Sequence, residues 1–168
     1  SMYFRTIRDV LKEAAPNQLY LGCRFAWGNE VSIQVSARYC DVVSYNIYAK
    51  TPKAKMDMMK QAGDKPYIIG EFHFGALDRG MFHTGLIAVK DQKERAATYT
   101  QYVTDCLNDS NIVGCHWFQY MDSPVTGRSL DGENYQIGFL DNVDTPYAEI
   151  IAASRKLGAN MYRMRAGK

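Results

Sequence analysis

The chain lacks several features, and each absence excludes a class of protein. It has no run of roughly 18 apolar residues, so the sequence predicts no segment that spans a bilayer. Its four cysteines, Cys23, Cys40, Cys106 and Cys115, include no CxxC pair, which argues against a zinc site and a disulfide framework. Cys23 and Cys115 lie in apolar stretches, where a free cysteine acts as a small hydrophobic residue. The sequence therefore predicts no metal site and leaves the compartment open.

An excess of one charge is also missing. Lys and Arg number 20 against 18 Asp and Glu, giving a formal net charge of +2, and no basic stripe or acidic tail stands out. This balance argues against nucleic acid or a membrane surface as a partner. The chain does contain 12 Tyr, 7 Phe and 2 Trp, which fill cores and also stack on sugar rings. Its 168 residues and 46% hydrophobic content are typical of a single globular domain, residues 1–168.

Strand-like and helix-like stretches alternate along the chain. Predicted strands start near residues 19, 41, 66 and 111, a spacing that suits βα crossovers rather than hairpins. The strands are continuously apolar, as in a parallel sheet covered by helices, so the sequence predicts an α/β domain of four parallel strands. The predicted helices are 3–15, 30–39, Thr51-Pro52 to Gly63, about 91–108, and Pro146 toward Arg163 with Gly158 as a candidate break. Residues 30–39 also alternate like a strand, and we prefer helix because a βα unit needs its crossover there.

Two polar segments are expected to face solvent. Lys90–Arg95 reads as the solvated start of a helix. The long loop 122–144 carries four acids whose spacing is not that of a calcium loop, so solvated carboxylates are expected there. These acids are Asp122, Asp131, Glu133 and Asp141.

One predicted strand ends in a charge. The apolar run Pro66–Gly75 brings Glu71 and His73 to a single strand end. A buried carboxylate costs desolvation free energy unless partners or a cleft receive it, and parallel α/β proteins usually place their chemistry at this end of the strands. We therefore take Glu71 as the candidate catalytic residue. The alternative is a structural carboxylate paired with Arg24 or His73. His73 and His116 lack companions at metal-ligand spacing and are expected to be framework histidines.

Several motifs together point to a family. Ile68–Glu71, Ser44–Asn46 and His116–Tyr120 resemble the last strands of a (β/α)8 glycoside hydrolase of clan A. Within that clan, Leu21–Asn29 and Tyr135–Asp141 look closest to the family 50 β-agarases. The resemblance covers nearly the whole chain. It implies that the four βα units correspond to strands five to eight of a TIM barrel, which makes the chain a half barrel.

The resemblance also implies roles for individual residues. Glu71 would be the nucleophile in the retaining hydrolysis of a β-galactan such as agarose, and no cofactor is implied. Tyr45 or Tyr48 is expected to hydrogen-bond Glu71 and keep it ionised. Trp117 would form the floor of the sugar subsite, with packing in the core as the alternative. The full set of implied substrate contacts is Arg24, Trp27, Tyr45, Asn46, Tyr48, His73, Trp117 and Gln119.

The general acid/base of the clan, a Glu at the end of strand four, has no clear counterpart here. Asn29-Glu30 looks like the acid/base dipeptide, but two predicted strands rather than three separate it from the end of the Glu71 strand. We therefore expect the isolated chain to be inactive. Full-length members of the family suggest a secreted or periplasmic protein.

Four strands of an eight-stranded barrel leave two unpaired edges and an inner face whose apolar layers would meet water. We therefore expect the chain to associate, either with a second copy or with the missing amino-terminal half of the barrel. Two other functions stay open at this point. One is a non-catalytic carbohydrate-binding or scaffold module, and the other is an unrelated α/β domain in which Glu71 is structural.

Overall fold

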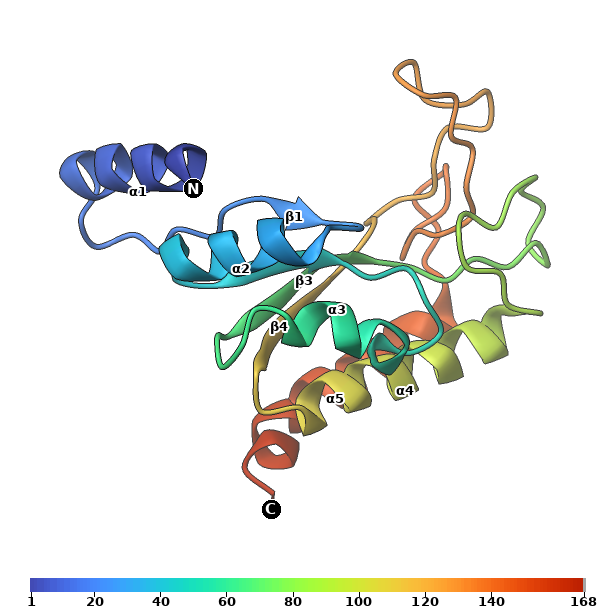
Figure 1. Cartoon of the computed structure of the whole chain (residues 1–168). Coiled ribbons are helices and arrows are strands. Elements are labelled where there is room, and N and C mark those ends of the chain that lie inside the picture. The colour runs from blue at the N-terminus through green and yellow to red at the C-terminus, as the bar shows by residue number, and fades with distance from the viewer. Residues whose placement is uncertain (168) are drawn as a thin grey trace.

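The computed structural model describes residues 1–167 and contains one four-stranded parallel sheet (Figure 1). The strands follow the chain in the order β1-β2-β3-β4, which confirms the predicted α/β fold of four parallel βα units. Their bounds are Arg24–Phe25, Val43–Asn46, Tyr67–Phe72 and Ile112–Trp117. β1 is shorter than the strand predicted from residue 19, because only its two residues pair with β2 and it has no partner on the other side.

The helices lie close to their predicted positions. They are α1 (Met2–Ala14), α2 (Glu30–Tyr39), the 3-10 turn η1 (Pro52–Lys55) leading into α3 (Met56–Lys60), α4 (Gln92–Asn108) and α5 (Ala148–Arg165). Asn29 caps α2 by accepting a hydrogen bond from the Ser32 N–H at 2.8 Å, which explains why this stretch is a helix and not a strand. α5 continues through Gly158 without the expected break, since its packing along α4 outweighs the roughly 1 kcal/mol helix cost of one glycine. No helix within residues 1–167 is long and apolar enough to cross a membrane.

The main core lies between the sheet and the helices. Tyr45 of β2 and Ile69 of β3 are completely buried, and Phe72 of β3 stacks on Tyr102 of α4 with ring centroids 4.2 Å apart. In Figure 1, α4 and α5 run side by side on this side of the sheet, and the loops that follow β3 and β4 extend beyond the strand ends on the right. A smaller cluster of Phe4, Tyr20 and Cys40 joins α1 to the edge strand.

The opposite face of the sheet carries mainly glycines and polar side chains. The prediction of apolar layers on this face is therefore wrong for most of its residues. Strand alternation places Ser44, Ile68, Gly70 and Gly114 on this face. A Cβ added to Gly70 would lie 2.3 Å from the Cδ of Arg24, which crosses the sheet at this point. Arg24 therefore occupies space that a side chain at residue 70 would need.

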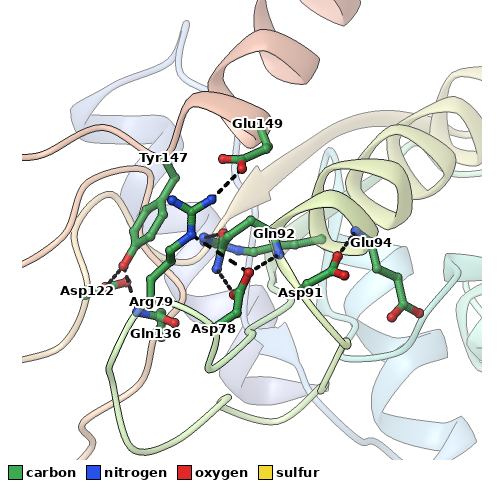
Figure 2. Close-up of polar contacts among 10 residues, drawn as sticks. Asp78, Arg79, Asp91, Gln92, Glu94, Asp122, Gln136, Tyr147 and Glu149 are labelled. Carbon is green, nitrogen blue, oxygen red and sulfur yellow. Dashed lines mark hydrogen bonds and ion pairs between the residues drawn. The ribbon is translucent and has the colours of Figure 1, made fainter.

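The prediction of a solvated helix start at Lys90–Arg95 is wrong for Gln92 and Arg95, whereas Lys90 and Lys93 are exposed as expected. Arg95 has no exposed surface, because it reaches from α4 to the carbonyl of Phe74 at 2.9 Å and to the carbonyl of Gly138 at 2.5 Å. Gln92 is buried beside it and hydrogen-bonds the Asp78 carboxylate (Figure 2). This segment fixes both strand-end loops to α4.

Asp122 is likewise not a solvated acid. It is 4% exposed and accepts a hydrogen bond from the Tyr147 hydroxyl at 2.6 Å (Figure 2). It also accepts one from the Gly138 N–H at 2.6 Å. Asp131 and Asp141, by contrast, are exposed or half-exposed loop acids that order their own turns. The four cysteines are free, and Cys23 and Cys115 are only partly buried.

Candidate active site

A bulge determines which way Glu71 points. Tyr45 of β2 pairs with Ile69, but the next residue, Asn46, pairs with Glu71, so Gly70 is an extra residue in β3. Strict alternation would have turned Glu71 toward the helices and Phe72 away from them. Instead Phe72 is 1% exposed in the core. The bulge therefore turns Glu71 to the helix-free face at the carboxyl end of the sheet.

Two side chains from other elements hold the Glu71 carboxylate. Its Oε1 lies 3.0 Å from Arg24 Nη1, and its Oε2 accepts a hydrogen bond from the Tyr48 hydroxyl at 2.6 Å. The Glu71 side chain is 19% exposed, so it is open to solvent on one side. Burial, followed by the hydrogen bond to Glu71, raises the pKa of Tyr48, which keeps this hydroxyl protonated and donating.

His73 supports Tyr48 from behind. Its ring lies 4.8 Å from the Tyr48 ring, it is 1% exposed, and its Nε2 accepts the Leu86 N–H at 2.8 Å. Its Nδ1 is buried without a hydrogen-bond partner among residues 1–167. Burial lowers the pKa of His73 to about 4, so the imidazole is neutral near pH 7. His73 thus packs behind Tyr48 with one ring nitrogen hydrogen-bonded and the other unpaired.

Asn46, like His73, has an unused polar atom, and it lies beside Glu71 in the sheet. It is paired with Glu71 in the sheet, and its Oδ1 is buried without a hydrogen-bond donor among residues 1–167. Buried polar atoms usually have partners, so an unpaired acceptor beside a carboxylate fits a site that a polar ligand completes.

Two of the expected substrate contacts lie elsewhere. Tyr45 has no exposed surface, and its hydroxyl donates to the Met59 carbonyl at 3.0 Å, so it cannot contact a sugar or Glu71. Trp117 points into the helix-facing layer, where its N–H donates to the Ile137 carbonyl at 2.8 Å and its ring packs edge-on against Phe72. Of the two roles considered for Trp117, packing in the core therefore fits the structure better than forming the floor of a sugar subsite.

The other expected contacts lie near the strand ends. Trp27 follows β1 and is 86% exposed. Gln119 follows β4, and its Nε2 donates to the Ser123 hydroxyl at 3.4 Å. Glu30 is an exposed residue in the first turn of α2 and accepts a hydrogen bond from Gln34 at 2.8 Å.

Sequence reasoning missed an aromatic lining around His73. The rings of Phe118 and Tyr135 lie 6.1 Å and 6.0 Å from the His73 ring, and His83 stacks on Tyr135 at 4.8 Å. Tyr135 opens one of the motifs of the family resemblance, which is the one signal that pointed to this segment. Trp117 drew the prediction that fits its neighbour Phe118 better, because β4 has an extra residue, Val113, between the pairs Tyr67–Ile112 and Ile68–Gly114, which reverses the faces of the residues that follow.

The arrangement suits nucleophilic chemistry at a carboxylate. Glu71 is accessible from one side, and a phenol and a guanidinium group orient it. Retaining glycoside hydrolysis also needs a second carboxyl group about 5–5.5 Å away, to act as the general acid. Among the described residues, no group of three or more His, Cys, Asp or Glu side chains could hold a metal ion.

Comparison with known proteins gives close matches to parts of larger ones. No family model matches the chain. Beta-agarase B from Vibrio sp. (strain JT0107) is 48% identical over 169 residues, covering 99% of this chain and 18% of that protein. The chain therefore spans less than a fifth of the length of this curated relative.

Solved structures agree with this match. A structure described as an exo-beta-agarase superposes with a TM-score of 0.93 at 46% identity, covering 99% of this chain and 23% of that one. The agarase AgWH50C superposes with a TM-score of 0.92 at 45% identity, covering 97% of this chain and 26% of that one. The similarity thus extends over the sequence and the fold of nearly the whole chain.

Proposed function

Since the sequence and fold match a segment of the family 50 β-agarases, we propose that this chain supplies the nucleophile of a retaining glycoside hydrolase. The substrate is a β-galactan such as agarose, and Glu71 is the nucleophile. One observation carries the proposal: the β3 bulge turns Glu71 to the open face, where Tyr48 and Arg24 orient its two oxygens.

In the proposed reaction, a Glu71 oxygen attacks the anomeric carbon and forms a covalent glycosyl ester, while the bond to the leaving oxygen breaks. A general acid protonates that oxygen and then removes a proton from the water that hydrolyses the ester. Tyr48 and Arg24 orient Glu71 during the attack and stabilise it when it leaves. Asn46 accepts a sugar hydroxyl with its unpaired Oδ1.

The general acid comes from outside this chain. Glu30 does not fit the role, because it is exposed and bound within its own helix to Gln34. A completed barrel would bring strand four beside β1, with the acid at the carboxyl end of that strand. The isolated chain is therefore inactive and acts together with the amino-terminal half of a barrel.

The free edge at β4 supports this partner. A groove of about 520 Å³ lies between β4, α4 and α5, lined in part by Cys115, Leu157 and Met161. Val113 on β4 is 58% exposed beside it. In a closed barrel, strand one and its neighbours would cover this edge. A second copy of the chain bound here would show as a homodimer in sedimentation experiments.

The test transfers this chain into Beta-agarase B from Vibrio sp. (strain JT0107), in place of the 169 residues that align with it. We expect the chimera to hydrolyse agarose. Glu71→Gln should lower its kcat at least about 10³-fold, because the nucleophile is lost while the shape is kept. Glu30→Gln provides the matched control and should leave the rate within about twofold.

Two outcomes would overturn the proposal. One is a folded, active chimera in which Glu71→Gln has no effect. The other is a folded chimera that binds agaro-oligosaccharides but does not cleave them, a result that would favour a non-catalytic carbohydrate-binding module. Loss of activity with Glu30→Gln would instead assign a role to Asn29-Glu30.

A further inference from the structure

The loop after β4 contains an ordered charged unit that the proposed mechanism does not use. Arg128 makes two hydrogen bonds to the Asp131 carboxylate, at 3.1 and 2.6 Å, and its backbone N–H donates to the Glu133 carbonyl at 2.9 Å. Its guanidinium carbon lies 5.5 Å above the Phe118 ring. The loop is thus held in one shape over an aromatic residue at the strand end.

Glu133 is the member of this unit with free bonding capacity. Its Oε2 is buried 2.6 Å from Arg128 Nη2, but not in the geometry of a hydrogen bond, and its side chain is 24% exposed. Its Oε1 forms no hydrogen bond with any residue of the described part of the chain. An ordered carboxylate oxygen without a donor is a ready acceptor for a ligand hydroxyl.

Contacts connect Glu133 to the candidate nucleophile. The Phe118 ring under Arg128 neighbours His73, which in turn packs on Tyr48, the hydrogen-bond donor to Glu71. Burial raises the pKa of Glu133, the charge of Arg128 opposes this rise, and the charges of Asp131 and Glu71 add to it. Two rings, Phe118 and His73, thus separate Arg128, the ion-pair partner of Glu133, from the donor to Glu71.

We propose that Glu133 is a specificity-determining residue of the sugar site, which accepts hydroxyl groups of a neutral galactan and disfavours a sulfated or uronate-bearing one. This inference rests on the proposed function and adds the residue that selects for an uncharged sugar. Arg128 does not attract an anionic sugar, because its guanidinium group is already hydrogen-bonded to the Asp131 carboxylate.

The local charges support selection against anions. Within residues 1–167, the ion pairs of Glu71, Asp131 and Glu133 involve two guanidinium groups, those of Arg24 and Arg128, so three carboxylates share two cations. A sulfate or carboxylate on the substrate would meet net negative charge and would lose hydration without gaining a cation. A neutral ring can instead donate hydroxyl hydrogens to Glu133.

The test measures binding by the whole 168-residue chain with two probes of equal length, the neutral neoagarotetraose and a sulfated carrageenan tetrasaccharide. Calorimetry or NMR titration gives each dissociation constant. We expect the unmodified chain to bind the neutral probe at least about tenfold more tightly than the sulfated one. Glu133→Gln should weaken binding of the neutral probe about tenfold, since the amide is a poorer acceptor than the carboxylate. It should also reduce the ratio between the two dissociation constants, since the amide is uncharged.

Glu13→Gln, the same substitution on the exposed surface of α1, is the matched control and should leave both constants unchanged. NMR spectra of each variant verify that the loop keeps its fold. The inference is overturned if the unmodified chain binds neither probe, if it binds both equally, or if Glu133→Gln keeps both affinities. The proposed function is judged separately by Glu71→Gln in the chimera, so the two can fail independently.

Discussion

The two sides of the sheet use their polar side chains in opposite ways near the carboxyl ends of the strands. On the helix side, Tyr45, Tyr102 and Arg95 are completely buried, and each bonds to backbone carbonyls of a neighbouring segment. On the open side, Glu71 is held by side chains, and Asn46 keeps an unpaired oxygen. These three saturated donors on the helix side thus stabilise the fold, and the unpaired Asn46 oxygen beside Glu71 on the open side can receive a ligand.

The strongest way to test this division is to remove Arg95. Arg95→Met keeps the length of the side chain but leaves the carbonyls of Phe74 and Gly138 without their donor. We expect the free energy of unfolding to fall by about 3–5 kcal/mol, because removal of one member of a buried charged network leaves buried polar groups unpaired. Urea denaturation followed by circular dichroism measures this change.

The exposed Arg155 on the neighbouring helix α5 provides the control. Arg155→Met should change the unfolding free energy by no more than about 0.5 kcal/mol. If both variants unfolded at the same urea concentration, the buried network in Figure 2 would not stabilise the helix side, and the contrast between the two sides would be lost.

His73 sharpens the comparison because it lies between the two sides. Burial lowers its pKa to about 4 from an ordinary value of 6.5, with the charge of Arg95 adding to the effect. The unfolded chain therefore takes up a proton at higher pH than the folded chain, so stability falls as the pH drops from about 6.5 to about 4. Linkage predicts a loss of about 2 kcal/mol between pH 7 and pH 5 from this residue.

Urea denaturation of the unmodified chain and of His73→Gln, at several pH values, measures this contribution. The amide can still accept the Leu86 N–H, but it does not titrate, so the variant should show a flatter pH dependence in this window. His116→Gln, on the exposed side of β4, should keep the slope of the unmodified chain. Equal slopes for all three proteins would mean that His73 takes up its proton at the same pH in the folded and the unfolded chain.

The sequence predicted those features whose cause is local. The helix caps at Asn29 and Asp91 and the proline after Thr51 place helix starts within a residue or two of the observed ones. Glu71 was also identified as a candidate site residue from its own strand alone, because nothing in an apolar strand explains a charged residue at its end. The family resemblance, rather than a local pattern, indicated Tyr48 as one of two candidate donors to Glu71.

The features that sequence reasoning missed depend on contacts between distant segments. Arg95 lies in a polar stretch, and the carbonyls that bury it belong to Phe74 and Gly138, far away in the chain. The β3 bulge at Gly70 adds one residue and so changes which side chains face the site beyond it. β4 likewise has an extra residue, Val113, so alternation alone does not give the face of Trp117, and Trp117 rather than Phe118 drew the sugar-binding prediction.

The last prediction uses two tyrosines of the same strand region, one on each side of the sheet. Tyr45→Phe removes a buried hydrogen bond to the Met59 carbonyl and should lower the unfolding free energy by about 1 kcal/mol without changing hydrolysis by the chimera. Tyr48→Phe removes the donor to Glu71 and should lower the rate of hydrolysis roughly tenfold, while stability changes by no more than about 0.5 kcal/mol. Each variant thus serves as the control for the other, since the chemical change is identical. A rate loss with Tyr45→Phe equal to that with Tyr48→Phe would mean that the core orients Glu71 as strongly as its own hydrogen-bond donor, and the division between the two sides would not hold.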